Sequence, residues 1–458
     1  MASNKEILDQ IVALEKAKAH NSFIINGQNF WPAIRIRLAF GLIERRYQSY
    51  ISRGKFLKLN LEILLKLFTF TQIKKKKIAI LFVSHSNYQY FIEGKFYDRV
   101  LEGYKINCRK NKEDFLELNL STGDIISFDD NLVIKRTQAH VLLLKIYAYI
   151  LSKVTKNRKS YLDIPINYVI KSLNETFSDY NASAFKLKQY IIYINLLIRY
   201  YKYSLKKLGV KEIYQATYYD PVGLSINAAA SQLGIKTYCA QHGGQSRNNP
   251  AFGQWNNIPL KGYEMLPDVF LCWDEWSAHT VNEWSSSSKK HTARITGYQW
   301  PELWKSGKIK YSGTETLCQL SKGRLNILYS MQPSIGGPPL VIKNVVKHFP
   351  EGVNWWFRLH PRQIGSQVEQ DLRKMYCNLD NVFISEATNE PLPAVMNVID
   401  IHLTCFSSCV YESMIFGVPT IFIDQAGEEY FDEIIQSGKA KLSLTFEELV
   451  SDINDKIL

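Results

Sequence analysis

Short apolar runs alternate with amphipathic stretches along most of this chain, and this alternation limits the possible folds more than any other feature. Residues 78–84 read IAILFVS, and a polar loop that begins with His85 follows them. A continuous run of β-branched and aliphatic residues is typical of a strand buried on both faces. A later predicted strand ends at Asp220, and residues 221–234, with Pro at the start and Gly at the end, predict a helix. Repetition of strand, helix and strand predicts an α/β fold with parallel sheets.

A polar stretch at residues 305–323 interrupts the alternation, which restarts after it. We therefore predict a linker there, between an N-terminal domain at 78–304 and a C-terminal domain at 324–440. A helical, basic extension is expected at 1–77 and a final helix within 441–458. The length of 458 residues suits two or three domains of roughly 150 residues each. Two doubly wound, Rossmann-like domains facing each other are expected to bind a ligand in a cleft beyond the carboxyl ends of their strands.

The chain is basic, with 56 Lys and Arg against 43 Asp and Glu and a net charge of +13. This excess favours an anionic partner, such as nucleic acid, an anionic membrane or a phosphorylated small molecule. No RNP-like strand, zinc finger or helix-turn-helix pattern supports nucleic acid, so we expect no nucleic-acid partner. Arginines recur from Arg35 onward, and four lysines at 74–77 close the first segment. The segment is interpreted either as a helical subdomain with a solvated charged face or as basic helices that lie on anionic lipid over residues 35–77.

The sequence also indicates a compartment. No apolar run reaches the roughly 20 residues that span a bilayer, and the charged N-terminus does not resemble a secretory signal. The seven Cys are scattered without a CxxC pair. This pattern argues against a disulfide scaffold and a structural zinc site, and it fits a reducing compartment. We expect a cytoplasmic protein, with peripheral attachment to the inner membrane as an open alternative.

Polar clusters follow several predicted strands. In the first half, His242, Gly243 and Gly244 come directly after one of them. The glycines would let the backbone approach a ligand closely, and a His at the mouth of a cleft can accept a proton near neutral pH. A glycine turn with an incidental His explains this cluster equally well.

The second cluster is Arg358, His360 and Arg362, at the end of a strand in the second half. Pro361 favours an extended conformation for His360, and strand alternation would put the three basic side chains on one side. Three converging donors suit a phosphate or diphosphate. Solvated basic residues at a strand end are the alternative interpretation.

The third cluster is Thr404, Ser407 and Ser408 before a predicted helix, with Glu412 in the second turn of that helix. Hydroxyl groups and unpaired N–H groups at a helix N-terminus bind anions, and a carboxylate can accept both hydroxyls of a ribose. Simple N-capping and an exposed surface Glu are the alternatives. Together the three clusters predict a pocket for a phosphorylated nucleotide in the second half and a candidate base in the first.

His-Gly, then His-Pro, then Ser-Ser with an acidic residue a helical turn later resembles the motifs of bacterial glycosyltransferases of the GT-B fold that build surface polysaccharides. Capsule-polysaccharide, sialyl- and Kdo-transferase families carry the His-Pro and Ser-Ser elements, and teichoic-acid glycerophosphotransferases carry all of them. The resemblance covers about residues 78–435. It implies transfer of a sugar from a CMP-, UDP- or GDP-sugar to a hydroxyl of a growing glycan, such as capsule, O-antigen or lipooligosaccharide, which is often lipid-linked.

The resemblance also implies residue roles on the donor side. His360 would bind the donor phosphate and help the nucleotide leave, Ser407 and Ser408 would bind the same phosphate, and Glu412 would hold the ribose. The predicted donor site is completed by Arg358, Arg362, Thr404, Gly243 and Gly244.

On the acceptor side, His242 would be the general base. The acidic-acidic-Gly motif of several sialyltransferases has no clear equivalent here, which leaves Asp220 as a rival base. No suitable DxD triplet is present, so we expect neither a metal nor a cofactor. The alternatives are a CDP-glycerol or CDP-ribitol transferase, a nucleotide-sugar epimerase, for which no acid–base pair is evident, and a non-catalytic protein that binds an anion or nucleic acid.

Overall fold

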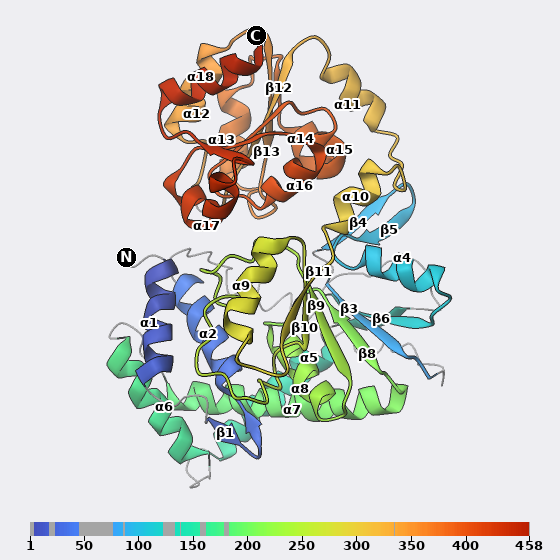
Figure 1. Cartoon of the computed structure of the whole chain (residues 1–458), viewed down its shortest axis with the longest axis vertical. Helices are drawn as coiled ribbons and strands as arrows, with labels where there is room; N and C mark the ends of the chain where they lie inside the picture. Colours follow the sequence, from blue (N-terminus) through green and yellow to red (C-terminus); the bar gives the residue numbers. More distant parts are fainter. Residues whose placement is uncertain are drawn as a thin grey trace. The chain divides into compact units, whose positions relative to one another are not determined.

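The structure is a computed structural model, and it describes residues 4–17, 23–44, 77–85, 88–121, 133–137, 139–155, 162–177, 183–333 and 335–457. The chain forms two compact units (Figure 1). Unit 1 comprises Met1–Phe91 and Lys95–Gly297, and unit 2 comprises Ile92–Gly94 and Tyr298–Leu458.

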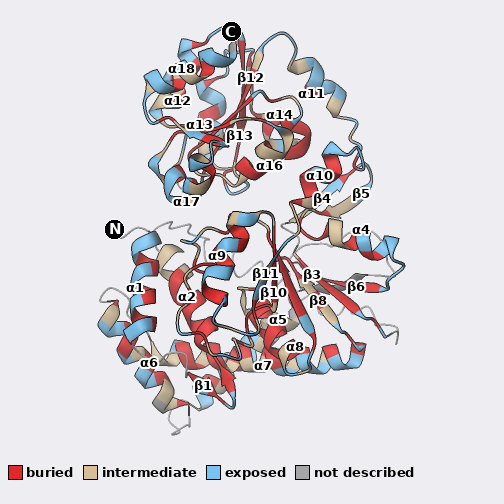
Figure 2. Ribbon diagram, in the orientation of Figure 1, coloured by how far each residue is buried: buried red, intermediate tan, exposed pale blue. Residues whose placement is uncertain are grey.

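Unit 1 is built on a seven-stranded sheet in which every neighbouring pair is parallel. In spatial order its strands are β11 (Thr292–Ile295), β10 (Val269–Cys272), β9 (Lys236–Ala240), β8 (Glu212–Gln215), β3 (Ile80–Ser84), β6 (Phe115–Ser121) and β7 (Val133–Thr137). All five residues of β3 are buried, as the apolar run at 78–84 predicts (Figure 2). A hairpin of β4 (Gln89–Ile92) and β5 (Lys95–Asp98) follows β3.

Helices cover both faces of this sheet. They are α4 (Glu102–Lys110), α5 (Ala139–Val154), α7 (Ala184–Leu208), α8 (Pro221–Ser231) and α9 (Glu275–Ser285), whereas α6 (Asp163–Thr176) packs on α7 and on α1 (Asn4–Ala17). The alternation along β3 assigns the two faces, because Leu81 and Val83 join the core formed with α7 and α8, whereas Phe82 joins Leu101 and Cys108 on the α4 side. This two-sided burial explains why the strand contains no polar alternation.

The N-terminal segment packs into unit 1 through α1 (Asn4–Ala17) and α2 (Trp31–Glu44), which are joined by a hairpin of β1 (Ile24–Ile25) and β2 (Gln28–Asn29). The interpretation of residues 35–77 as lipid-facing is wrong at Arg35, which is fully buried. Its Nε lies 2.9 Å from Oε1 of Glu15, and its guanidinium donates to the carbonyls of Pro250 (2.5 Å) and Gly253 (3.1 Å). Residues 45–76 lie outside the described residues.

Unit 2 is built on a six-stranded parallel sheet. Its strands, in spatial order, are β14 (Val382–Phe383), β13 (Val353–Arg358), β12 (Leu325–Ser330), β15 (Ile401–Thr404), β16 (Thr420–Phe422) and β17 (Ala440–Leu442). Its helices are α10 (Gln299–Lys305), α11 (Thr314–Leu320), α12 (Leu340–His348), α13 (Gln367–Met375), α14 (Ser385–Asn389), α15 (Leu392–Met396), α16 (Cys409–Phe416), α17 (Gln425–Gln436) and α18 (Phe446–Ile457). Each unit therefore has the predicted doubly wound α/β architecture.

The chain divides at Gly297, before the linker that the sequence predicts. Residues 305–323 belong to unit 2, where they include α11, and the buried Leu317 anchors this helix. The sequence predicts a linker where the structure has α11, because a short helix with a mostly polar surface has the same composition as a linker. Within the described part of the chain, no helix is long and apolar enough to cross a membrane.

Candidate functional site

The strand order of each sheet identifies where a ligand can bind. In unit 1, the strands that follow β3 in the sequence are added on one side of it, and those that follow β8 are added on the other side of the sheet. In unit 2, the order reverses in the same way between β12 and β15. Doubly wound sheets bind ligands beyond the carboxyl ends of the strands at such a switch point. The residues that follow these four strands are therefore the strongest candidates in each unit.

In unit 1, the switch point brings together His85, which follows β3, and Asp220, which follows β8. Nε2 of His85 lies 3.5 Å from Oδ2 of Asp220. The other carboxylate oxygen, Oδ1, accepts a hydrogen bond of 2.6 Å from the backbone N–H of Gly223 and caps α8. Asp at the N-cap with Pro221 at the first helical position fixes the carboxylate by local sequence alone. The His85–Asp220 pair places an imidazole and a fixed carboxylate side by side at the switch point.

His242 lies beside this pair, after β9. Its Nε2 is 2.9 Å from the hydroxyl oxygen of Tyr219, and its ring lies 5.2 Å from the ring of Tyr88. Burial lowers the pKa of His242 to about 4, and the charges on Arg99 and His85 act in the same direction. The imidazole is therefore neutral at neutral pH. Its Nδ1 is buried, and hydrogen bonds of the ring to the backbone of Ala216 and Ala240 partly offset the lowering of the pKa.

The two glycines after His242 do not adopt the left-handed backbone conformation that would require glycine. Neither Gly243 nor Gly244 has a positive φ. A Cβ on Gly243 would meet no atom within 4 Å, so this residue borders open space. Its carbonyl accepts from Nε2 of Gln241 at 3.0 Å, which fixes the loop.

In unit 2, the basic cluster after β13 does not converge as alternation predicts. The strand ends at Arg358, and residues 361–365 form a turn, so the alternation does not extend to Arg362, which is exposed. Nη1 of Arg358 donates to the carbonyls of Ala387 (2.5 Å) and Glu390 (2.9 Å) at the end of α14. Arg358 therefore joins β13 to α14, a contact that sequence spacing does not reveal.

His360 is held as a hydrogen-bond donor. Its Nδ1 accepts the backbone N–H of Arg362 at 3.1 Å, so in the neutral ring the proton is on Nε2. Burial and the charge of Arg362 lower its pKa, which keeps the ring neutral. The backbone N–H of His360 donates to Gln363 at 2.9 Å, and Gln363 in turn donates to the carbonyls of Gln332 and Gly336 after β12.

The loop after β15 is shaped by its own hydroxyls. Thr404 is buried, and its Oγ1 donates to the carbonyl of Ser330 (3.0 Å) and accepts the N–H of Ser407 (3.2 Å). Oγ of Ser407 accepts the N–H of Cys409 at 3.3 Å. Ser408 is the N-cap of α16, and its side chain makes no capping hydrogen bond. Thr404 and Ser407 thus stabilise the turn, whereas the Ser408 hydroxyl is not used for capping.

Glu412 is not the exposed residue that one alternative predicts. It is buried, and its Oε1 accepts a hydrogen bond of 2.7 Å from the hydroxyl of Tyr298. Both residues belong to unit 2. Tyr298 therefore orients the Glu412 carboxylate from within the same unit.

A network of buried side-chain hydrogen bonds lies next to the switch point of unit 2. His402 on β15 lies 3.0 Å from the hydroxyls of both Ser330 and Thr420, and Thr420 lies 2.6 Å from the hydroxyl of Ser413 on α16. Burial lowers the pKa of His402 to about 3, so its ring is neutral. This hydrogen-bond network joins β12, β15, β16 and α16 near the predicted donor residues. It could not be predicted without knowing which strands pair.

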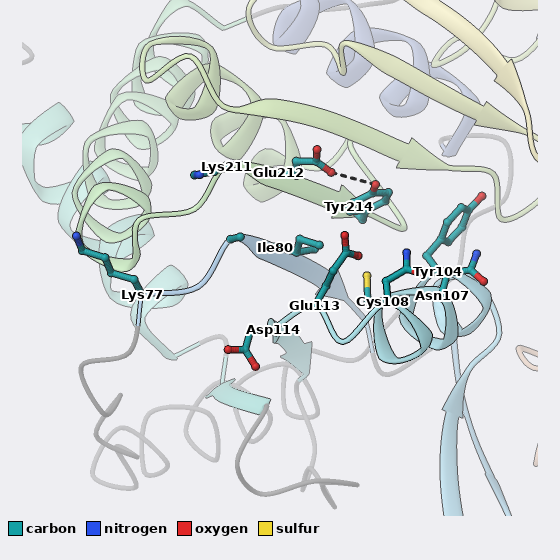
Figure 3. A pocket seen from close by; sticks show the side chains of 12 residues that line it. Lys77, Ile80, Tyr104, Asn107, Cys108, Glu113, Asp114, Lys211, Glu212 and Tyr214 are labelled. Carbon is teal, nitrogen blue, oxygen red and sulfur yellow. Dashed lines mark hydrogen bonds between the residues drawn. The ribbon is translucent and has the colours of Figure 1, made fainter.

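Among the described residues, no group of three or more His, Cys, Asp or Glu side chains could hold a metal ion. A pocket of about 610 Å³ lies at the amino ends of β3 and β8 in unit 1, at the opposite end of these strands from His85 and Asp220 (Figure 3). It is lined by acidic and basic side chains, including Glu212 and Lys211, and by none of the residues predicted from the sequence.

Comparison with known proteins identifies no family. No protein-family model and no curated protein matches the chain. Among solved structures, UDP-GlcNAc 2-epimerase from Methanocaldococcus jannaschii is similar with a TM-score of 0.49 and 12% identity, over 82% of this chain and 92% of that chain.

Two other solved structures give similar values. The Neisseria meningitidis UDP-GlcNAc 2-epimerase bound to UDP-GlcNAc has a TM-score of 0.46 and 13% identity, over 82% and 91% of the two chains. The wall teichoic acid polymerase TagF has a TM-score of 0.45 and 11% identity, over 91% and 89%. At these values the similarities establish neither a family nor an activity for this chain.

Proposed function

We propose that the protein is a metal-independent glycosyltransferase that moves a sugar from a nucleotide-activated donor to a hydroxyl of a bacterial surface glycan. Unit 2 binds the nucleotide, and unit 1 accepts the proton of the attacking hydroxyl. The observation that carries this proposal is the fixed Nε2–H donor of His360, which is oriented by the N–H of Arg362 on its other ring nitrogen. A neutral, pre-oriented donor of this kind stabilises the charge of a departing phosphate without any reorganisation.

The donor half of the reaction follows from these contacts. The acceptor oxygen attacks the anomeric carbon, the bond between that carbon and the phosphate oxygen breaks, and the nucleotide leaves with the electron pair. The negative charge on the phosphate is stabilised by His360, by the Ser408 hydroxyl and by the N-terminus of α16. Arg358 and Thr404 act by holding α14 and the loop after β15 in place.

The acceptor half requires a base in unit 1. His242 is neutral, but a pKa of about 4 makes it a weak proton acceptor. The His85–Asp220 pair is the competing base, because the imidazole and the carboxylate lie 3.5 Å apart at the switch point, and Gly223 holds the carboxylate in place. We assign proton acceptance to this pair and the orientation of the acceptor hydroxyl to His242 and Tyr219.

The cellular context of the proposal is the cytoplasmic face of the inner membrane, where a lipid-linked glycan would be the acceptor. A CDP-glycerol or CDP-ribitol transferase would use the same anion-binding groups, with attack at phosphorus in place of carbon. Because both reactions use the same site, the identity of the donor must decide between them.

The test is the release of nucleotide from CMP-, UDP- and GDP-sugars and from CDP-glycerol, measured in EDTA with the full-length protein. We expect release from one donor class, and a loss of at least about 100-fold in His360→Ala, in the range typical of a transition-state donor. His348→Ala, which alters an exposed His at the end of α12, is the matched control. Release from no donor, or equal release by His360→Ala, would contradict the proposal.

A further inference from the structure

Helix α5 exposes an unusual amount of apolar surface. Its exposed large apolar side chains, between 40% and 62% exposed, are Leu143, Ile146, Tyr147, Tyr149, Ile150 and Val154. All of these except Tyr149 recur at positions i, i+3, i+4, i+7 and i+11 from Leu143, which places them on one face of the helix. We call these five residues the α5 stripe. A contiguous apolar patch of this kind marks an interaction surface.

The opposite face of α5 is anchored in unit 1. Ala148 and Ser152 are fully buried where α5 packs against α7, and the ring of His140 lies 5.0 Å from that of Tyr200 on α7. Ala148 and Ser152 lie on the far side of the helix from Leu143 and Ile150, as do Val141 and Leu144, which pack against the core of unit 1, so the α5 stripe faces away from that core. The stripe is therefore a fixed part of the folded surface.

The charged residues of α5 and α7 are all basic, although Lys188 of α7 is buried and paired with Asp163 of α6 at 3.0 Å. Helix α5 contains two lysines and no acidic residue, and α7, against which it packs, contains six Lys and Arg and no acidic residue. Lys145 and Lys153 are exposed, and Nζ of Lys153 lies 5.3 Å from the ring of Phe185. Lysines that extend their aliphatic stems beside apolar side chains are typical of helices at a membrane surface.

We propose that the α5 stripe inserts into the interfacial layer of an anionic membrane, with Lys153, which lies beside the stripe, contacting lipid phosphates. Apolar burial supplies one part of the affinity, and attraction of the basic α5–α7 pair to anionic headgroups supplies the other. This inference rests on the surface of unit 1 alone and holds whatever reaction the protein catalyses.

The charge pattern disfavours a second copy of the chain as the occupant of the stripe. In a two-fold symmetric contact, the same surface of both copies meets, so the lysines of α5 would face each other without acidic partners. An anionic lipid surface provides the complementary charge and accepts a convex helix face without a groove.

Sedimentation of the full-length protein with lipid vesicles tests the proposal. We expect binding to vesicles of phosphatidylcholine with 30% phosphatidylglycerol, and much weaker binding to phosphatidylcholine alone, since about 1 kcal/mol per basic side chain near the surface comes from anionic lipid. Leu143→Gln/Ile150→Gln should lower the partition coefficient by about tenfold or more. The control is Leu340→Gln in unit 2, where Leu340 is 71% exposed, and it should bind as the unaltered protein does.

A second pair of variants separates the two contributions. Lys145→Gln/Lys153→Gln should reduce the preference for anionic vesicles, and the remaining binding should depend less on salt. Thermal unfolding must show that each variant is folded. The proposal is overturned if the unaltered protein does not bind anionic vesicles, or if Leu143→Gln/Ile150→Gln binds as well as Leu340→Gln. It is also overturned if sedimentation velocity shows a dimer that this double variant converts to monomer while vesicle binding stays unchanged.

Discussion

Asp220 contacts two partners with its two carboxylate oxygens: Oδ2 lies 3.5 Å from Nε2 of His85, and Oδ1 caps α8 through the N–H of Gly223. The first contact joins the ends of the two strands at the switch point of unit 1. The second holds the carboxylate in a fixed position. One residue therefore has a structural and a chemical role that substitutions can separate.

Asp220→Asn should retain the cap and lose the charge. Asn is as good an N-cap as Asp, so we expect the free energy of unfolding to change by no more than a few tenths of a kcal/mol, whereas Asp220→Ala should lose about 1 kcal/mol. Nucleotide release should fall by at least about tenfold in Asp220→Asn, because the imidazolium loses its counter-charge. Denaturant titration and the release assay measure the two effects.

His85→Asn and Asp220→Asn should be non-additive. If the two side chains act as one proton acceptor, the double variant should release nucleotide no more slowly than the slower of the single variants. Additive losses would show that the two residues act independently and would return the role of base to His242.

The buried His402 should make the protein less stable in mild acid. Its pKa is lowered to about 3 by burial, whereas the ordinary value is 6.5. Between these values the unfolded chain binds a proton that the folded chain does not, so the free energy of unfolding falls as the pH is lowered, by up to about 1.4 kcal/mol per pH unit.

His402→Asn should make this pH dependence shallower between pH 6 and pH 4, even though it lowers stability at every pH. The buried Asp98, whose pKa burial raises to about 6, acts in the opposite direction and is present in both proteins. Urea unfolding at a series of pH values measures the slopes. Equal slopes would contradict the assignment of His402 as a neutral, buried group.

The Arg35–Glu15 pair should be essential for the stability of unit 1. Arg35→Met leaves Glu15 buried without its counter-charge, and we expect a loss of about 3–5 kcal/mol. Arg35→Met/Glu15→Gln should recover part of this loss, because the uncompensated charge is removed. A change below about 0.5 kcal/mol in Arg35→Met would show that the N-terminal segment is not integral to the unit.

Much of the fold could be predicted from the sequence, because strands buried on both faces have a recognisable composition. The run that became β3 is almost entirely apolar in the sequence, and all of its residues are buried in the structure. The burial of Arg35 could not be predicted, because besides Glu15 its partners are carbonyls of residues more than 200 positions away. In the sequence a buried arginine and a solvated one have the same appearance.

The candidate site was predictable at the level of strand ends but not of contacts. Alternation along the strand suggested that Arg358 and Arg362 share one side, but the strand ends at Arg358. The approach of His85 to Asp220 depends on β3 lying next to β8, which follows from the sheet order and not from local sequence. Tyr219 belongs to no sequence motif, so only its hydrogen bond to His242 in the structure identifies it as part of the site.

The central claim, that unit 2 binds a nucleotide through His360, is tested most directly by thermal unfolding with CMP, CDP, UDP and GDP. A nucleotide at 100 times its dissociation constant should stabilise the protein by about 2.7 kcal/mol. We predict that one nucleotide raises the melting temperature, that His360→Asn removes most of this rise, and that His348→Asn retains it. No rise with any of the four nucleotides, or an equal rise in His360→Asn, would contradict the account.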